Sequence, residues 1–197
     1  MIIRRFSPLA MAAVALEKRA DGQGERIAGY AAVFFREGQA GTEYELWPGY
    51  VERVMPGAFD AALKDEHDCR ALFNHDPSQL LGRTASETCR LSVDSKGLRY
   101  EVDPPDTTIG HNVLEYLRRR DVTGSSFGFE VIDGDMRRET REGQEVWIRE
   151  VRSVRLWDVG PVTYPAYTAT EAEVRDIRAQ IEQRARAGAP VAPTVPG

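Results

Sequence analysis

Short stretches with a β pattern follow one another from Ile27 to Val159, and this succession most constrains what the chain can fold into. The clearest hairpin signal is the turn Asp94–Gly97, which separates the alternating segments Arg90–Asp94 and Leu98–Val102. Strands and helices do not alternate regularly, as they would in a parallel α/β fold. The expected fold is therefore mainly β with flanking helices (α+β), built on a closed or nearly closed antiparallel β-barrel.

Helical periodicity occurs in two places between the strands. It predicts a short helix over Ala58–Lys64 and a longer one from about Ile109 to Arg120. Two long β stretches follow, Ser126–Met136 and Gln144–Val159, and a charged turn over Arg137–Gly143 is expected to join them.

One domain is expected over residues 25–170. The start of the chain has the arginine pair and short apolar run of a weak signal peptide, but Pro8 interrupts the run and no clean cleavage site follows. Residues 1–24 are therefore expected to be flexible or to pair with a sheet. A charged helix is predicted over residues 171–187, and a disordered tail rich in Pro and Ala over residues 188–197.

Composition narrows the classes of partner. The net charge is -5 with both signs interspersed, which argues against nucleic-acid binding because phosphate contacts leave a basic footprint. No apolar run approaches the ~20 residues that cross a bilayer. The 2 cysteines form no disulfide framework and suit a reduced, cytosolic protein. Together with the 3 scattered histidines they match no metal-ligand spacing, so no metal or cofactor is expected.

The stretch Asp121–Phe129 places two hydroxyl residues, Ser125 and Ser126, after a helix and at the start of a long strand. A serine presented there is a candidate nucleophile, although an ordinary turn explains the same composition. Gly128, two residues after Ser126, would let the backbone approach a substrate closely. Composition alone does not rank the two serines.

A serine nucleophile needs a histidine that accepts its proton and a further group that orients the histidine. His75 has the best setting for such a base, since it ends an apolar strand and is held between Asn74 and Asp76. His67 lies in a charged loop. His111 lies in the first turn of a predicted helix, where the helix dipole disfavours its protonation.

Asp158 is an acid within a stretch that otherwise looks buried, which is costly unless the carboxylate is paired. An arginine, a backbone amide or a catalytic histidine would each satisfy it. Cys69 and Cys89 flank His75 in the sequence and offer a cysteine nucleophile as an alternative. Both lie in alternating β patterns, where small buried thiols are usual.

Taken in order, several segments resemble the prohead (capsid maturation) serine proteases of tailed bacteriophages. The similarity spans about residues 25–170. Any one segment is weakly specific, whereas the ordered set is specific. The segments are Ile27–Phe34, Glu52 with Pro56–Phe59, Asn74–Pro77 with Leu81–Thr84, Ser95–Leu98, Asp121–Phe129 and Leu156–Tyr167.

The resemblance implies a serine endopeptidase with a fold related to the herpesvirus assemblins, a β-barrel ringed by helices. By motif, the catalytic histidine corresponds to His75, the nucleophile to Ser126, and the acidic third member to Asp158, where the family more often has Glu. Assemblins use a second histidine as third member, which leaves His67 and His111 open.

The implied substrates are a scaffold protein, or the scaffolding segment of the major capsid protein, and the protease itself. They would be cut inside the assembling prohead, in the bacterial cytoplasm, and the assemblin relation implies a possible homodimer. The alternative is a catalytically inactive capsid-assembly or scaffold-binding module on the same fold. Contact between His75 and Ser126 would favour the protease, and placement on opposite faces would favour the inactive module.

Overall fold

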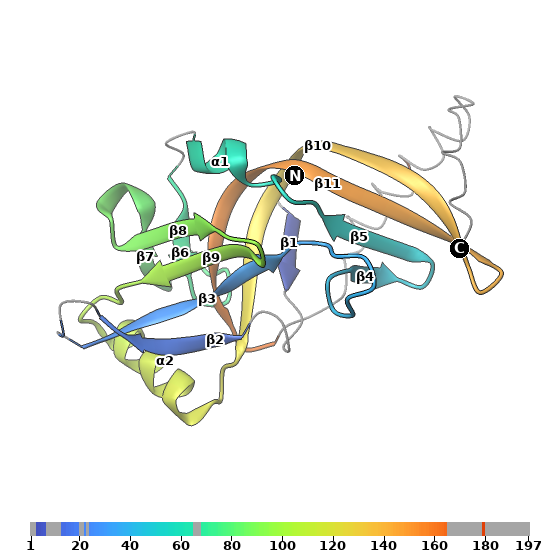
Figure 1. Ribbon diagram of the computed structural model, residues 1–197. Helices are drawn as coiled ribbons and strands as arrows, with labels where there is room; N and C mark the ends of the chain where they lie inside the picture. The colour runs from blue at the N-terminus through green and yellow to red at the C-terminus, as the bar shows by residue number, and fades with distance from the viewer. Residues whose placement is uncertain are drawn as a thin grey trace.

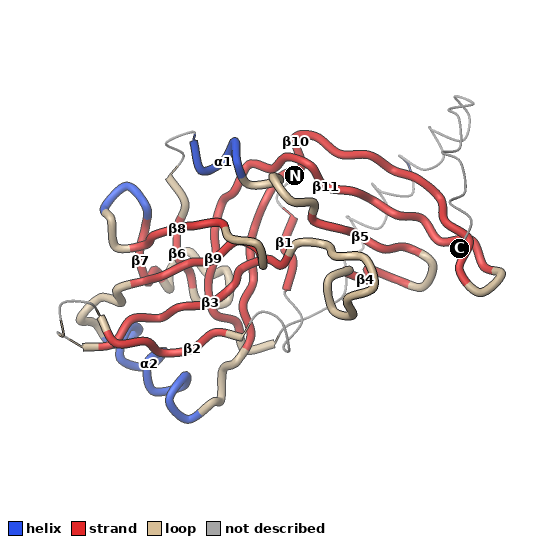
Figure 2. Tube along the Cα trace, viewed as in Figure 1, coloured by secondary structure: helices blue, strands red, loops and turns tan. Residues whose placement is uncertain are grey.

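The computed structural model describes residues 3–6, 13–19, 22, 24–64, 68–164 and 179. Most of these residues lie in strands, which form two sheets (Figures 1 and 2). The predicted helix over residues 171–187, apart from residue 179, and the predicted tail over 188–197 lie outside the described residues, as does His67. No described helix has the length and apolar character that a membrane span requires.

The larger sheet has seven strands and contains the longest pair among those described. Its main path runs β1-β10-β11-β5-β4; off this path β6 pairs with β11, and β7 pairs with β6. β11 pairs antiparallel with β10 but parallel with both β5 and β6. The strands are β1 (Ile3–Phe6), β4 (Tyr44–Trp47), β5 (Tyr50–Val54), β6 (Arg70–Leu72), β7 (Leu80–Arg83), β10 (Gly124–Arg141) and β11 (Gln144–Val162).

The smaller sheet has four antiparallel strands in the order β2-β3-β9-β8. Its strands are β2 (Val14–Lys18), β3 (Glu25–Val33), β8 (Cys89–Val93) and β9 (Gly97–Val102). The predicted hairpin is confirmed as β8–β9. The segment predicted to be flexible or to pair with a sheet contributes β1 and β2, one strand to each sheet.

The two helices predicted between the strands are present. α1 spans Asp60–Lys64 and α2 spans Thr108–Arg119. α2 begins after Thr107, whose side chain accepts a hydrogen bond from the Gly110 N–H, which is the role of a cap residue. Val113 and Leu117 form its buried face. A 3₁₀ turn over Thr84–Ser86 follows β7.

The mainly β prediction is confirmed, but the closed antiparallel barrel is not. The described strands divide into two sheets, and neither closes on itself. The parallel pairing of β11 with β5 and β6 also departs from an antiparallel order. These pairings depend on which distant strands lie side by side, whereas the sequence pattern reports only the strands themselves.

The β10–β11 hairpin is longer than predicted, and the turn expected over Arg137–Gly143 is wrong in extent. Pairing continues to Arg141 opposite Gln144, so only Glu142 and Gly143 form the turn, both with positive φ. Together with β5 and β4 the hairpin extends away from the smaller sheet (Figure 1).

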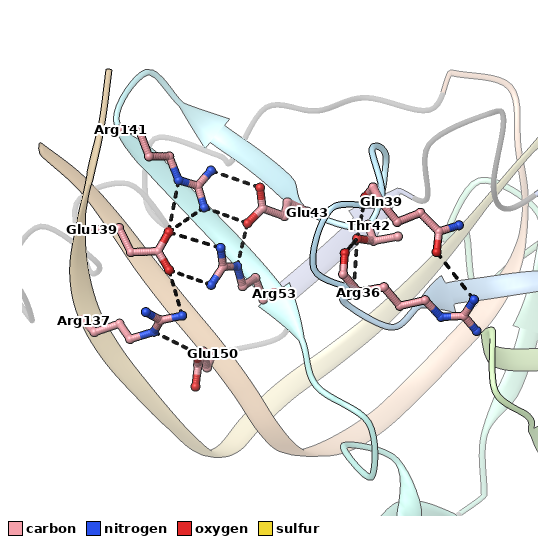
Figure 3. A network of polar contacts seen from close by, with 9 residues as sticks. All are labelled: Arg36, Gln39, Thr42, Glu43, Arg53, Arg137, Glu139, Arg141 and Glu150. Carbon is pink, nitrogen blue, oxygen red and sulfur yellow. Dashed lines mark hydrogen bonds and ion pairs between the residues drawn. The ribbon is translucent and has the colours of Figure 1, made fainter. Parts of the chain in front are cut away.

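Charged side chains on this extension satisfy one another. Figure 3 shows the Arg53 guanidinium between Glu43 and Glu139, with Arg141 bridging the same two carboxylates. Nearby, Arg137 donates to Glu150 over 2.9 Å. The ion pairs therefore explain why long charged segments remain strands: their charges are matched across the sheet.

The core lies between the two sheets near the start of β10. Phe127 and Phe129 are fully buried and stack with ring centroids 4.6 Å apart. Phe59 meets the Phe127 ring edge-on at 5.9 Å, which is a favourable aromatic arrangement. Tyr100 of β9 is also fully buried. This packing fixes the face of β10 that turns inward, and with it the face of each serine.

Candidate active site

Three side chains from different parts of the chain meet beside the start of β10. The Ser126 hydroxyl contacts Nε2 of His75, and Nδ1 of the same ring contacts Oδ1 of Asp158. All three residues are buried, with 0% of Ser126, 8% of His75 and 6% of Asp158 exposed. A carboxylate accepts hydrogen bonds, so it fixes the proton on Nδ1 and leaves Nε2 as the acceptor for the serine hydroxyl.

Strand alternation determines which serine faces the histidine. Successive side chains of a strand point to opposite faces, so Ser125 shares the core face with Phe127, while Ser126 and Gly128 share the other. The Ser125 hydroxyl lies 2.9 Å from the hydroxyl of Tyr100, and both groups are buried. Ser125 therefore links the two sheets and faces away from His75.

Gly128 gives the Asp158 carboxylate its space. The two residues are register partners on β10 and β11. A Cβ at residue 128 would lie 2.3 Å from Asp158 Oδ2, closer than any side chain tolerates. The Asp158 carboxylate thus occupies the space that a side chain at residue 128 would need.

The turn that carries His75 has an unusual backbone. Asn74 and His75 have φ values of 56° and 57°, in the left-handed region that few residues other than glycine adopt. Hydrogen bonds close the turn from Phe73 N–H to the Gln79 carbonyl and from Asp76 N–H to the Phe73 carbonyl. Consecutive residues in this region persist only where surrounding contacts hold them.

Asn74 supplies those contacts. Its N–H donates to the Pro161 carbonyl over 3.1 Å, and its Oδ1 accepts from the Thr163 N–H over 2.8 Å. Its Nδ2 donates to Thr163 Oγ1 over 3.0 Å. The end of β11 thus holds the residue before His75, a few residues beyond Asp158. Thr163 was not predicted from the sequence, because nothing in its neighbourhood along the chain signals this role.

Close backbone packing brings β6 against the same end of β11. Gly160 lies opposite Ser126 in the β10–β11 ladder. A Cβ at residue 160 would lie 2.0 Å from the carbonyl oxygen of Leu72, the last residue of β6. Only glycine allows this approach, which sets the distance between the strand leading to His75 and the strand carrying Asp158.

The hydrogen-bonded chain from Ser126 to Asp158 does not include His111, Cys69 or Cys89. The His111 ring is exposed in α2 and lies 2.8 Å from Asp106. Cys69 and Cys89 are buried free thiols, and burial raises the pKa of Cys69 well above its usual value and that of Cys89 to about 12. Thiolates are the reactive form, so neither cysteine is suited to act as a nucleophile at neutral pH. Within the described residues no group of His, Cys, Asp and Glu is arranged to hold a metal ion.

Comparison with known proteins identifies a matching family. The model of the caudovirus prohead serine protease family matches residues 14–184 of the 197. No curated protein matches the chain, and neither does any solved structure. The matched range includes the three clustered residues and all the described strands except β1.

Proposed function

Because this chain belongs to the caudovirus prohead serine protease family, we propose that Ser126, His75 and Asp158 are the catalytic triad of a serine endopeptidase active in capsid maturation. The observation that carries the proposal is the continuous hydrogen-bonded chain from Ser126 Oγ through the His75 ring to Asp158 Oδ1. A serine hydroxyl becomes a competent nucleophile only when a base of this kind accepts its proton.

In the first step the Ser126 oxygen attacks the carbonyl carbon of the scissile peptide bond, and its proton passes to Nε2 of His75. The imidazolium that forms keeps its Nδ1–H on Asp158, whose negative charge stabilises it. The tetrahedral intermediate collapses as the C–N bond breaks and the leaving amine takes the proton from Nε2.

The second step returns the enzyme to its starting state. His75 removes a proton from water, which attacks the acyl group on Ser126, and the ring then returns that proton to the serine oxygen as the carboxylic acid leaves. Asp158 has a shorter side chain than Glu, which the family more often has here. The absence of a Cβ at Gly128 supports direct contact by this shorter acid, since the two residues lie opposite each other on paired strands.

We further propose that the substrates are a scaffold protein or the scaffolding segment of the major capsid protein, and the chain itself. The family supports a role inside the assembling capsid. The inactive-module alternative has no observation in its favour, because an inactive fold has no need for a buried histidine that contacts both a serine and a carboxylate.

The test pairs the two neighbouring serines. Ser126→Ala, co-expressed with the cognate major capsid protein, should lower cleavage by about 10⁴-fold or more. Ser125→Ala should keep cleavage within about tenfold and lose roughly 1 kcal/mol of stability with its Tyr100 hydrogen bond. New N-termini, mapped by mass spectrometry, measure cleavage. If Ser125→Ala abolishes cleavage and Ser126→Ala does not, the assignment is wrong.

A further inference from the structure

The strand β1 lies directly beside the proposed nucleophile. It pairs antiparallel with β10 so that Ile3, Arg4, Arg5 and Phe6 lie opposite Phe129, Gly128, Phe127 and Ser126. β1 is an edge strand of the larger sheet, and β10 is its one neighbour among the described strands. Its removal would leave the backbone N–H and C=O groups of Ser126–Phe129 as an open sheet edge at the proposed catalytic serine.

The site also has to open before it can act. Ser126 is 0% exposed. The carbonyl carbon of a substrate peptide therefore cannot reach its Oγ unless a neighbouring segment of the protein moves aside. A four-residue edge strand with one partner is among the least stable elements of a sheet, and such elements open locally at low free-energy cost. β1 is therefore the element best placed to yield to a substrate.

We propose that the edge of β10 over Ser126–Phe129 binds the substrate residues that precede the scissile bond as an antiparallel strand, and that β1 occupies this site in the absence of substrate. The proposal rests on the proposed function of Ser126. The register gives the polarity: residues before the one opposite Ser126 lie along Phe127–Phe129, and the chain then continues past the nucleophile. The ligand is an extended polypeptide, recognised mainly through its backbone.

Competition from β1 has a predictable strength. A segment of the same chain reaches its site at an effective concentration in the millimolar range, so it outcompetes weak peptides added from solution. Weakening β1 should therefore strengthen binding of a peptide in trans. In an antiparallel pair, every second residue of a strand directs its backbone N–H toward the partner. Of any two adjacent residues of β1, one therefore donates to β10, and proline at both positions removes that donor.

The experiment measures binding without cleavage, in full-length chains that all carry Ser126→Ala. The probe is a fluorescein-labelled peptide with the sequence of residues 1–12, MIIRRFSPLAMA. Arg4→Pro with Arg5→Pro should bind it about tenfold or more tightly than the unaltered background does. The matched control, Arg4→Ala with Arg5→Ala, removes the same charges but keeps the N–H groups, and it should bind like the background.

Hydrogen exchange places the probe on β10. In the proline variant the amides of Ser126–Phe129 that face β1 should exchange faster, and the probe should protect them again. A probe with proline at its own positions 4 and 5 should not bind. Equal binding by all three proteins, or no binding to the proline variant, would overturn the proposal. The binding experiment requires no cleavage, so its failure is distinguishable from failure of the proposed function. The proposed function would fail if Ser126→Ala still cleaved its substrate.

Discussion

At the scale of single residues, the absence of a side chain at Gly128 matters as much as the presence of one at Asp158. Substitution by alanine would put a methyl group 2.3 Å from Asp158 Oδ2 and force the carboxylate away from His75. We expect Gly128→Ala to lower kcat/KM by about 100-fold, the scale of loss when a catalytic group is misplaced by about 1 Å. Peptide cleavage by the purified chain measures it.

Two controls separate this effect from general damage. Gly134 lies on the same strand as Gly128, and Gly134→Ala places a methyl group 2.5 Å from the carbonyl oxygen of Glu150 on β11. It should reduce thermal stability while leaving kcat/KM near wild type. If Gly128 acts through Asp158, then Gly128→Ala combined with Asp158→Ala should be no worse than Asp158→Ala alone. Wild-type activity in Gly128→Ala would contradict this account.

At the scale of elements, the turn after β6 positions His75 by attachment to the end of β11. Asn74→Ala should lower kcat by about tenfold to 100-fold, because both side-chain bonds to Thr163 are lost and alanine disfavours a φ of 56°. Asn74→Gly tolerates that φ but still lacks the side chain, so its activity isolates the contribution of the bonds.

Thr163→Val gives a third comparison, since it keeps the backbone N–H and removes only the hydroxyl partner of Asn74. It should be the mildest of the three. The readout is kcat from steady-state cleavage, with circular dichroism to confirm folding. Full activity in Asn74→Gly would show that the backbone conformation alone places the histidine.

Elements also show what the sequence could and could not predict. Turn chemistry and helical periodicity are local, and they correctly predicted the β8–β9 hairpin and α2. Strand partnership is not local, so the barrel expectation was not confirmed once β11 paired with β5 and β6. For the site, family resemblance suggested Ser126. The alternation of side chains along a strand also separates the two serines: Ser125 lies on the same face as Phe127 and Phe129, and Ser126 lies on the opposite face.

At the scale of the whole molecule, the charges of the extended hairpin link stability to pH. Burial opposes ionisation of Glu43 and Glu139, but hydrogen bonds from Arg141 and Arg53 outweigh it and lower the pKa of both from 4.5. The folded state thus binds fewer protons than the unfolded state. This contribution to stability is complete above pH 4.5 and is lost as the pH falls through the lowered pKa values.

Glu43→Gln with Glu139→Gln should therefore flatten the acid limb of a plot of Tm against pH. At neutral pH the free energy of unfolding of the double variant should fall by roughly 2 to 3 kcal/mol, because the buried Arg53 keeps its charge without its partners. The two carboxylates are partly exposed to solvent, which keeps the loss below that for a fully buried pair. Glu145→Gln, which disrupts the more exposed pair with Arg138, is the control and should follow wild type. An unchanged acid limb in the double variant would contradict the link.

The position of β11 in the sequence has a consequence for the timing of activity. This last described strand supplies Asp158, and the chain just beyond it supplies Thr163, while His75 and Ser126 come from 83 and 32 residues before Asp158. While residue 158 of a nascent chain is still inside the ribosome, His75 lacks its proposed partner Asp158 and its turn lacks the contact with Thr163. On the proposed assignment, we therefore expect proteolytic activity to begin only after synthesis has passed this strand, so that the growing chain is not cut prematurely.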